Sequence, residues 1–361
     1  MISFSILRDF YINKRVLLTG HTGFKGSWML KFLHLLNAQV TGYALAPEKQ
    51  QCLFNLIDGN NLCKSIIGDI GDQERLQRLI IDFQPQIIFH FAAQPLVRYS
   101  YSNPVETFQT NVIGTANLLN CIRALDNECT LINITTDKVY DNKEWLFPYR
   151  ENDILGGYDP YSSSKACSEL VTSSFTNSFF PLNKYSIHKK TIATCRAGNV
   201  IGGGDWSDNR IMPDIIASLN SHEVIQIRNP NSVRPWQHVA EPLSGYLLLA
   251  MQLSLNPPIF SGAWNFGPDS HDNLTVEEIT EYAIQCWGSG AYSIEENKNQ
   301  PHEANQLRLD ISKVVNLLKW SPKWRAQEAV KRTVEWYKVF YASPTEAANL
   351  MNETILEYFH Q

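Results

Sequence analysis

Short runs of β-favouring apolar residues alternate with helical patterns through the first two thirds of the chain, and this alternation restricts the fold more than any other feature. The runs cover residues 15–19, 39–44, 65–68, 86–91, 131–135, 191–196 and 263–266. Continuous apolar runs of this length are typical of strands that are buried on both faces. Strands separated by helices predict an α/β fold with a doubly wound parallel sheet.

Several helical patterns are clear. Residues 72–83 begin with Asp72, which is placed to cap a helix, and continue with apolar residues at helical spacing, namely Leu76, Leu79, Ile80 and Phe83. A second helix is expected to begin at Pro104, with Val105, Phe108 and Val112 on its buried side. Further helices are predicted after Pro160, after the capping-box pair Thr275 and Glu278, after Ala326 and after Pro344.

Composition and charge exclude several classes of protein. The chain has 361 residues, of which 44% are hydrophobic and 19% are charged, as expected of a globular protein of about two domains. A net charge of −5 without a concentration of Lys and Arg argues against a nucleic-acid partner. The seven cysteines include no Cys-x-x-Cys pair, so we expect reduced thiols and no metal site. Since no apolar stretch approaches the roughly 20 residues of a membrane span, we expect no membrane partner and a cytoplasmic protein.

The first predicted strand leads into a glycine-rich turn. Residues 15–26 read RVLLTGHTGFKG, and an amphipathic helix follows. Glycines at this junction permit a tight turn and a close backbone approach, and the helix N-terminus then faces a pyrophosphate. We therefore predict a Rossmann domain that binds a dinucleotide. The candidate cofactor-binding residues are Gly20, Thr22, Gly23, Phe24, Gly26, Asp69, Ile70, Ala92, Ala93 and Gln94, together with Tyr161 and Lys165.

Single residues do not identify the dinucleotide. The end of the second strand usually carries an acid for NAD or an arginine for NADP, and residues 41–45 read TGYAL, with neither. Asp69 follows the third strand, where its carboxylate either accepts a hydrogen bond from the adenine amino group or forms a turn.

Tyr161 and Lys165 stand four residues apart after Pro160, so both side chains point to one face of a helix, as in a short-chain dehydrogenase/reductase. A tyrosine titrates near ~10, and one cation about 4 Å away supplies roughly the ~4 kcal/mol needed to lower that pKa by about three units. Tyr185 and Lys189 share the spacing but lie in a polar connection before the run at 191–196. Tyr161, by contrast, follows a predicted strand that ends at Thr136, and ligands bind at this edge of an open parallel sheet. The predicted catalytic residues are Asn111, Thr136, Tyr161 and Lys165.

Six segments of the chain carry a resemblance to a known family. They are TGHTGFKGSW from Thr19, TTDKVYDNKEW from Thr135, YDPYSSSKACSEL from Tyr158, RAGNVIGGGDW from Arg196, RNPNSVRPWQHVAEPLSGYLLLA from Arg228 and PHEANQLRLDISK from Pro301. The chain resembles the extended short-chain dehydrogenases/reductases that act on nucleotide sugars, and within them most closely the 4,6-dehydratase subgroup that uses CDP-glucose. The resemblance covers nearly the whole chain.

The resemblance implies that CDP-D-glucose is converted to CDP-4-dehydro-6-deoxy-D-glucose and water, with a tightly bound NAD. Tyr161 would take the C4 hydroxyl proton as hydride leaves C4, and Lys165 would lower the pKa of Tyr161 and hold the nicotinamide ribose. Thr136 would hydrogen-bond the C4 oxygen. Asp137 would protonate the departing C6 hydroxyl before hydride returns to C6. Such an enzyme would supply deoxysugars for a lipopolysaccharide O-antigen.

Lys138 departs from the wider pattern of the family. Related dehydratases commonly have Thr-Asp-Glu, in which the glutamate removes the C5 proton, whereas this chain has Thr136, Asp137 and Lys138. A lysine could act as this base if burial or neighbouring cations lowered its pKa. The alternative is that Lys138 only positions a phosphate or Asp137.

Substrate residues are expected in a second lobe. Residues 1–200 would form the NAD-binding domain and 201–361 an interleaved, smaller mixed α/β lobe, with strands near 225–270 returned to the first domain. The resemblance implies that Asn199 approaches the sugar or its phosphate and that Arg234 clamps the pyrophosphate, with Arg210 as a further candidate. His302 and Arg308 either line the nucleotide pocket or lie in a solvated loop.

Two other functions would require a different set of residues at this site. A nucleotide-sugar 4-epimerase would keep Tyr161 and Lys165 but has no use for an acid and a base beside Thr136. A cofactor-sensing module without chemistry would be expected to lack Tyr161 or Lys165. A 4,6-dehydratase of another nucleotide sugar stays open, because no residue in the sequence identifies the base. The resemblance also implies a homodimer formed by paired helices.

Overall fold

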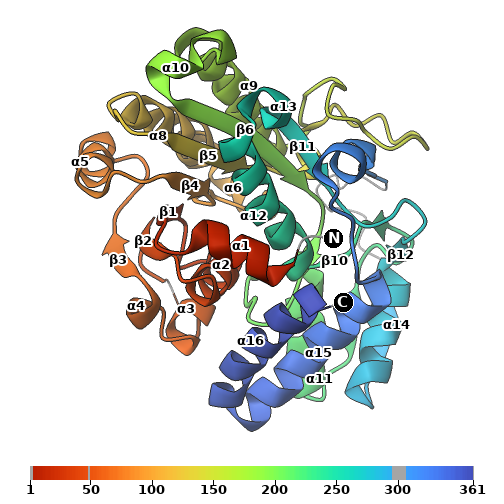
Figure 1. Ribbon diagram of the computed structural model, residues 1–361. Helices are drawn as coiled ribbons and strands as arrows, with labels where there is room; N and C mark the ends of the chain where they lie inside the picture. The colour runs from red at the N-terminus through yellow and green to blue at the C-terminus, as the bar shows by residue number, and fades with distance from the viewer. Residues whose placement is uncertain (1–2, 48, 295–305, 361) are drawn as a thin grey trace.

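The computed structural model describes residues 3–47, 49–294 and 306–360, which are arranged around a parallel sheet with the strand order β11-β6-β5-β4-β1-β2-β3 (Figure 1). The strands are β1 (Arg15–Thr19), β2 (Gln39–Ala44), β3 (Lys64–Ile67), β4 (Ile87–His90), β5 (Cys129–Ile134), β6 (Lys190–Ala197) and β11 (Gly262–Phe266). Neighbouring strands run in parallel, with Leu17 of β1 between Thr41 and Ile88. The carboxyl ends of all these strands therefore lie at one edge of the sheet, where ligands bind in open parallel sheets.

Helices cover both faces of this sheet. Helices α1 (Phe4–Tyr11), α2 (Phe24–Leu35) and α12 (Ala240–Leu255) share a core with Val16 and Leu18 of β1. Helices α5 (Gln73–Phe83), α8 (Gly114–Ile122) and α9 (Pro160–Phe179) cover the opposite face, where Leu17 is buried. Successive residues of β1 thus enter opposite cores, as the alternation of side chains along a strand requires.

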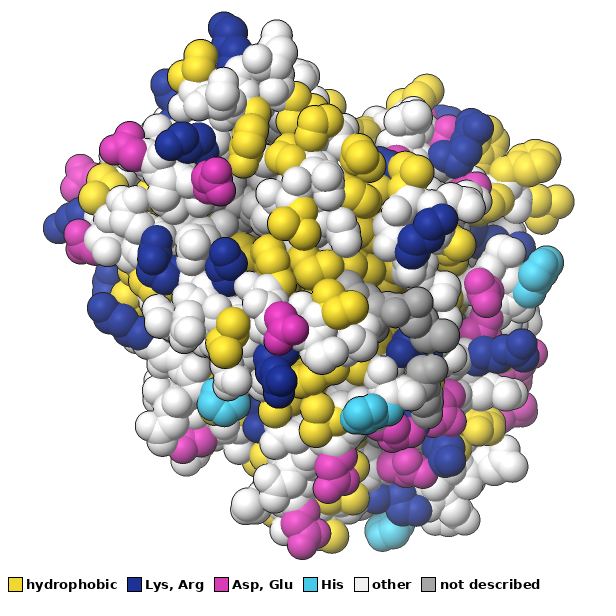
Figure 2. Space-filling model, in the orientation of Figure 1, with side chains coloured by type: hydrophobic (Ala, Val, Ile, Leu, Met, Phe, Trp, Pro, Cys, Tyr) yellow, Lys and Arg dark blue, Asp and Glu magenta, His cyan; other side chains and the backbone are white. Residues whose placement is uncertain are grey.

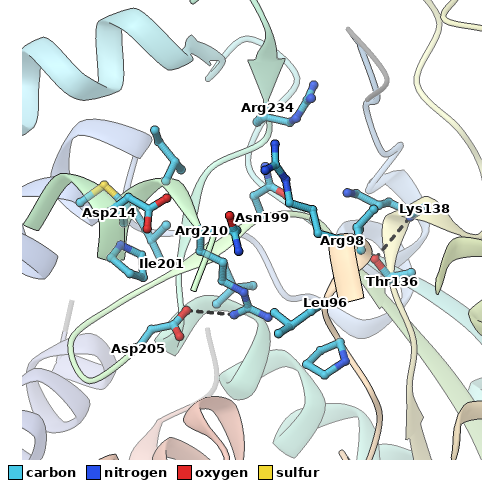
Figure 3. A pocket seen from close by; sticks show the side chains of 18 of the residues that line it. Leu96, Arg98, Thr136, Lys138, Asn199, Ile201, Asp205, Arg210, Asp214 and Arg234 are labelled. Carbon is cyan, nitrogen blue, oxygen red and sulfur yellow. Dashed lines mark hydrogen bonds and ion pairs between the residues drawn. The ribbon is translucent and has the colours of Figure 1, made fainter. Parts of the chain in front are cut away.

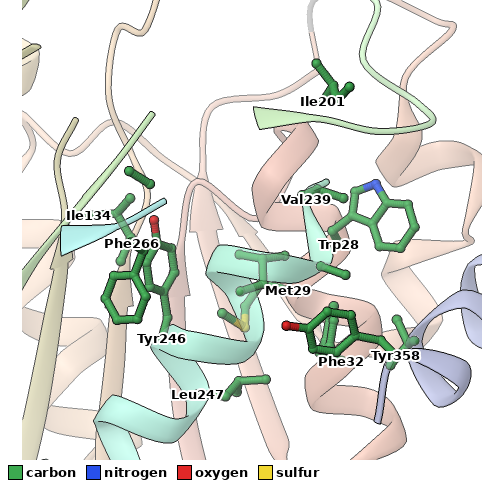
Figure 4. Packing of buried hydrophobic residues seen from close by; sticks show 14 of the residues in the cluster. Trp28, Met29, Phe32, Ile134, Ile201, Val239, Tyr246, Leu247, Phe266 and Tyr358 are labelled. Atoms are coloured by element: carbon green, nitrogen blue, oxygen red, sulfur yellow. The ribbon is translucent and has the colours of Figure 1, made fainter. Parts of the chain in front are cut away.

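The larger core is built from aromatic and aliphatic side chains of helices that are distant in sequence. Figure 4 shows Met29 of α2 beside Leu247 of α12, and Trp28 of α2 beside Val239, which directly precedes α12. Each such side chain stabilises the fold by roughly 1.5 to 3 kcal/mol when it is fully buried. This packing holds the start of α2, and with it the glycine-rich turn, against the sheet.

After β6 the chain leaves the sheet and returns to it once. It runs through β7 (Val200–Ile201), α11 (Ile211–Asn220), β8 (Ile225–Ile227), β9 (Val233–Arg234) and β10 (Gln237–His238). Helix α12 then leads back across the sheet to β11. The last part contains β12 (Leu274–Thr275), α14 (Val276–Trp287), β13 (Tyr292–Ile294), α15 (Ala326–Ala342) and α16 (Pro344–His360), which gather near α11 in Figure 1. The second half of the chain thus contributes both to the sheet and to a separate group of helices.

The remaining helices are short. They are α3 (Leu53–Leu56), α4 (Gly59–Leu62), α6 (Val97–Ser102), α7 (Pro104–Phe108), α10 (Tyr185–His188) and α13 (Pro257–Phe260). Lys189 follows α10, and its carbonyl oxygen accepts a hydrogen bond from Cys129 at the start of β5. The pair Tyr185 and Lys189 therefore lies at the amino end of the strands, away from the ligand-binding edge. Among the described residues, no helix combines the length and the apolar character that a membrane span requires.

The strands and helices predicted from the sequence are confirmed, with small differences at their ends. One detail is wrong: Val105 is 68% exposed. A π-helical turn at Gln109–Ile113 separates α7 from α8, and the buried positions are occupied by Thr107 and Asn111. Polar residues occupy these positions because this side of the helix packs against a polar loop that contains Gln94. Gln94 Nε2 donates to Thr107 Oγ1, and the Gln94 backbone N–H donates to Asn111 Oδ1.

Candidate active site

At the carboxyl edge of the sheet, the turn between β1 and α2 requires glycine at two positions. Gly20 has a φ of +73°, and a Cβ there would come within 2.7 Å of the Ala92 nitrogen. A Cβ on Gly26 would overlap the Gly20 carbonyl oxygen. The turn therefore lies directly against the end of β4, with Gly23 as the residue before Phe24, where α2 begins. Backbone N–H groups at such a helix start bind pyrophosphate, so the residues present fit a dinucleotide.

Other candidate cofactor residues lie at the same edge. The Thr22 hydroxyl donates to the Leu45 oxygen after β2 at 3.0 Å. Asp69 follows β3, where its Oδ1 accepts from the Gly71 N–H at 2.7 Å, and this is a turn contact. A contact between Asp69 and adenine stays a prediction. The remaining candidates of this group follow β3 and β4, namely Ile70, Ala92 and Ala93.

Asn111 connects the loop after β4 to α9. Its Oδ1 accepts from the Gln94 N–H at 2.9 Å, and its Nδ2 donates to the Gln94 oxygen at 3.1 Å and to Ser164 Oγ at 2.8 Å. The side chain is buried. These contacts hold the loop and the helix together, which supports a positioning role for Asn111 within the predicted catalytic set.

Tyr161 lies in the first turn of α9, which begins with a capping box. Asp159 Oδ1 accepts from the Ser162 N–H at 3.0 Å, and Ser162 Oγ accepts from the Asp159 N–H at 3.1 Å. The Tyr161 phenol is buried and lies near the Thr136 side chain in the same cavity. Burial raises the pKa of Tyr161 to about 12, while the nearby Thr136 hydroxyl and the positive charge of Arg210 act in the opposite direction.

Lys165 lies one turn further along α9. Its Nζ donates to the Ile134 oxygen at the end of β5, at 3.1 Å. Burial and, to a smaller extent, the nearby charge of Lys25 lower the pKa of Lys165 to about 7, although the charge of Glu169 opposes them. The positive charge that lowers the phenol pKa in this structure is that of Arg210. The expected effect of Lys165 on Tyr161, and its contact with a nicotinamide ribose, stay predictions.

Thr136, Asp137 and Lys138 directly follow β5. Thr136 caps a short 3-10 turn over Asp137–Val139, and its hydroxyl donates to Asp137 Oδ1 at 2.9 Å. Burial raises the pKa of the Asp137 carboxyl, although neighbouring lysine and arginine charges and the bond from Thr136 oppose this. A carboxyl with a raised pKa retains its proton more readily and suits general acid catalysis. The side chains of Tyr161, Thr136 and Asp137 thus form one series of neighbours in the cavity, with a hydrogen bond between Thr136 and Asp137.

These residues line one end of a cavity of about 600 Å³. Figure 3 shows Thr136 and Lys138 at one end, Asp214 at the other, and Asn199 and Arg210 between them. Arg210 Nη1 is held by Asp205 Oδ2 at 2.9 Å. The structure brings the predicted catalytic segment into one cavity with three predicted substrate residues, Asn199, Arg210 and Arg234.

Two predicted substrate residues are not placed at this cavity. His302 lies outside the described residues. Arg308 is described but does not belong to the cavity lining. Its carbonyl oxygen accepts from the Tyr149 N–H at 2.8 Å, beside the bridge between Tyr149 and Leu309. The structure thus gives Arg308 a place in the packing of two loops against each other.

The cavity also contains charged residues that sequence patterns did not indicate, among them Lys25, Arg98, Asp214 and Arg228. Lys25 belongs to the glycine-rich turn, and a charge within this otherwise uncharged turn is a signal that the sequence contains. Burial and the charge of Arg210 lower the pKa of Lys25 to about 8, and two acidic residues oppose this. The other three come from α6, α11 and the loop after β8, and no local pattern connects these segments.

The chain matches known proteins over most of its length. The family model described as GDP-mannose 4,6 dehydratase matches residues 17–333. The CDP-glucose 4,6-dehydratase of Salmonella typhimurium is 49% identical over 333 residues, which cover 92% of this chain and 93% of that protein. The dTDP-glucose 4,6-dehydratase of Xanthomonas campestris is 25% identical, over 89% of this chain and 92% of that protein.

Solved structures share the fold at lower identity. A dTDP-glucose 4,6-dehydratase from Streptomyces venezuelae with NAD and TYD bound has a TM-score of 0.76 at 22% identity, covering 92% of this chain and 99% of that chain. An epimerase from Methanothermobacter thermautotrophicus has a TM-score of 0.79 at 20% identity, covering 95% and 98%. Because a dehydratase and an epimerase share this fold, the site has to distinguish the two reactions.

Proposed function

This chain belongs to the GDP-mannose 4,6-dehydratase family of extended short-chain dehydrogenases/reductases, and on that premise we propose that it is a hydro-lyase acting on CDP-D-glucose. The products are CDP-4-dehydro-6-deoxy-D-glucose and water. The 49% identity to the Salmonella typhimurium CDP-glucose 4,6-dehydratase supports the choice of nucleotide sugar. The arrangement of acidic and hydroxyl side chains in the cavity supports the choice of reaction.

The observation that carries the proposal is the series of Tyr161, Thr136 and Asp137, which line one cavity and in which Thr136 bonds the Asp137 carboxyl. A 4-epimerase exchanges hydride with C4 only, and its reaction involves no departing hydroxyl. A buried carboxyl with a raised pKa beside the Thr136 hydroxyl suits proton donation to a hydroxyl that leaves as water. The series therefore favours a dehydratase over an epimerase.

NAD is the proposed cofactor. Gly20 and Gly26 allow the turn, the start of α2 and the end of β4 to approach one another closely, which fits a turn that presents backbone N–H groups to a pyrophosphate. Bound NAD would supply the acceptor for hydride from C4 and the donor for hydride to C6. Lys165, buried at the end of β5, would hold the nicotinamide ribose.

Tyr161 and Thr136 are proposed to act on the C4 oxygen. Tyr161 takes the proton of the C4 hydroxyl, and the positive charge of Arg210 favours the phenolate that this transfer requires. Thr136 hydrogen-bonds the same oxygen. A ketone at C4 makes the C5 proton more acidic, and its removal allows the C6 hydroxyl to leave with a proton from Asp137.

Lys138 is the proposed base at C5, and it lines the cavity directly after Asp137. The alternative role of Lys138 is to hold a phosphate or Asp137. Exchange of the C5 hydrogen with solvent deuterium separates these two roles. Asn199, Arg210 and Arg234 are proposed to bind the sugar and its pyrophosphate, since a guanidinium bonds two phosphate oxygens at once.

A panel of CDP-, dTDP-, GDP- and UDP-glucose tests the proposal. We expect turnover of CDP-glucose, with a product whose NMR spectrum shows a C6 methyl group and a C4 ketone or its hydrate. A product that keeps the C6 hydroxyl and has an inverted C4 would contradict the dehydratase and indicate an epimerase. Turnover of another nucleotide sugar alone would contradict the substrate and leave the reaction unchanged.

The protein is further proposed to work as a cytoplasmic homodimer that supplies a deoxysugar for a lipopolysaccharide O-antigen. Support for a dimer comes from apolar side chains on α7, on α9 and on the π-helical turn between α7 and α8. Val105 is 68% exposed, Ile113 53% and Leu170 57%. Sedimentation in solution measures the oligomeric state, and replacement of Leu170 by Glu should favour the monomer.

A further inference from the structure

A buried cluster of charged and hydroxyl side chains lies behind the proposed catalytic residues. Glu169 of α9 is buried, and both of its carboxylate oxygens are bonded. Thr135 Oγ1 donates to Oε1 at 2.6 Å, and Thr194 Oγ1 donates to Oε2 at 2.6 Å. Arg196 donates from Nε to Oε1 at 2.9 Å and from Nη2 to Oε2 at 3.0 Å. Thr135 is the member of this cluster that also lines the cavity.

Glu169 belongs to the face of α9 that carries Tyr161 and Lys165. The three residues are four apart, so they occupy successive turns of one helix face. All three meet the end of β5: Tyr161 lies near Thr136, Lys165 donates to the last carbonyl of the strand, and Glu169 accepts from Thr135. The contact at Glu169 thus determines how α9 lies along β5, and with it how the phenol lies against Thr136.

Arg196 makes this cluster rigid. Its Nη1 donates to the Tyr140 hydroxyl at 2.8 Å and to the Glu151 oxygen at 3.0 Å. The Tyr140 hydroxyl in turn donates to Asn265 Oδ1 at 2.7 Å. A buried carboxylate that has two bonds from an arginine and two from hydroxyls has little freedom to move. Such a group is suited to hold a helix in place.

We propose that the hydrogen bond from Thr135 to Glu169 is a positioning contact, which keeps the Tyr161 hydroxyl against Thr136 and the C4 oxygen of the sugar. Neither Thr135 nor Glu169 touches a reacting atom in this scheme. A misplacement of about 1 Å in a reacting group can lower a rate by roughly 100-fold. The inference rests on the proposed function, because it concerns the step at C4.

The cluster offers a matched pair of variants. Thr135→Val removes the hydroxyl that bonds Glu169 Oε1, and Thr194→Val removes the hydroxyl that bonds Oε2. Thr194 lies within β6, so its loss leaves the contact between α9 and the end of β5 in place. Both variants deprive the same buried carboxylate of one donor. Their effects on thermal stability should therefore be alike, whereas their effects on catalysis should differ.

The expected result is a kcat lowered by roughly 10- to 100-fold in Thr135→Val, with a KM for CDP-glucose within about twofold of the wild type. Thr194→Val should keep kcat within about twofold, because the position of Tyr161 is unchanged. Thr135→Ser keeps the hydroxyl and should restore most of kcat. The rate at which reduced cofactor forms in a single turnover should rank the variants in the same order as kcat does. This result would locate the effect at the oxidation of C4.

Equal kcat values for Thr135→Val and Thr194→Val would overturn the proposal, and so would a Thr135→Ser variant as slow as Thr135→Val. If Thr135→Val does not fold, Thr135→Ala and Thr194→Ala provide the same comparison. The wild type tests the proposed function separately. A wild type that turns over a different nucleotide sugar contradicts the substrate alone, and the variants are then compared with that sugar.

Discussion

The Thr136 hydroxyl donates to Asp137 Oδ1 at 2.9 Å, and the Tyr161 phenol lines the same cavity near it. One hydroxyl therefore connects the group proposed to act at C4 with the group proposed to act at C6. Thr136 and Asp137 are neighbours in sequence, and the 3-10 turn after β5 directs both side chains into one buried site. The two groups are nevertheless different side chains, so oxidation at C4 and elimination at C6 should respond to different substitutions.

Replacement of Asp137 by Asn should separate the two steps. Nucleotide-sugar binding and oxidation at C4 should remain, while elimination slows by roughly 100- to 10,000-fold, the range of a lost general acid. Reduced cofactor and a 4-keto sugar should then accumulate, and absorbance and NMR measure them. Asp141→Asn is a control, because Asp141 forms its ion pair with Lys143 on the surface. Elimination at the wild-type rate in Asp137→Asn would remove Asp137 from this role.

Replacement of Lys138 by Met should slow the exchange of the C5 hydrogen with deuterium if the amine is the base. We expect a fall of roughly 100-fold or more, with oxidation at C4 retained. Mass spectrometry of the product measures the exchange. Unchanged exchange together with a raised KM would instead assign Lys138 to phosphate binding.

Arg210 and Arg234 line the same cavity but should differ in their effect on pH dependence. The charge of Arg210 lowers the pKa of Tyr161, so Arg210→Met should raise that pKa. Since the phenolate is the reactive form, the rise of kcat/KM with pH should move about one unit to higher pH. Arg234→Met is the matched variant and should raise KM without moving the profile. A wild-type profile in Arg210→Met would contradict this role of Arg210.

The buried carboxyl of Glu241 should make the stability of the folded protein depend on pH. It is buried on α12, where it accepts from the Trp324 N–H at 2.7 Å and from the Tyr358 hydroxyl at 2.7 Å. Burial raises the pKa of Glu241 from 4.5 to about 7. Between pH 4.5 and 7 the Glu241 carboxyl stays protonated in the folded state but is ionised in the unfolded state. The contribution of Glu241 to the free energy of unfolding is therefore fully present below pH 4.5 and is lost as the pH rises towards 7.

The magnitude of this loss is up to about 3 kcal/mol. Glu241→Gln keeps the acceptor for the backbone N–H groups and cannot ionise, so its thermal midpoint should change less between pH 4.5 and 7 than that of the wild type. Calorimetry across this range measures the difference. Identical pH profiles for the two proteins would show that the pKa of Glu241 is the same in the folded and the unfolded state, against this prediction.

The sequence predicted those parts of the site that depend on local structure. Tyr161 and Lys165 were found because a helix repeats every 3.6 residues and places them on one face. Thr136 was found because it follows an apolar run, and the carboxyl ends of parallel strands meet at one edge. The structure places all three at the end of β5, as expected.

The positions predicted poorly depend on partners that are distant in sequence. Val105 was expected to be buried, but the neighbouring loop presents Gln94, and the π-helical turn places Asn111 towards it. Arg98 and Asp214 reach the cavity from separate segments, without a pattern of their own. The cluster around Glu169 joins residues of α9, β5 and β6 in the same way.

By itself the sequence determined the order of strands and helices, the glycine-rich turn and the candidate catalytic side chains, because periodicity and backbone sterics act over a few neighbouring residues. Tertiary structure alone decided which charges surround those side chains. The charge of Arg210, a residue distant from Tyr161 in sequence, lowers the pKa of the Tyr161 phenol. Burial raises the pKa of the Asp137 carboxyl. Such effects depend on distance in space and on exclusion of water, which the folded chain creates.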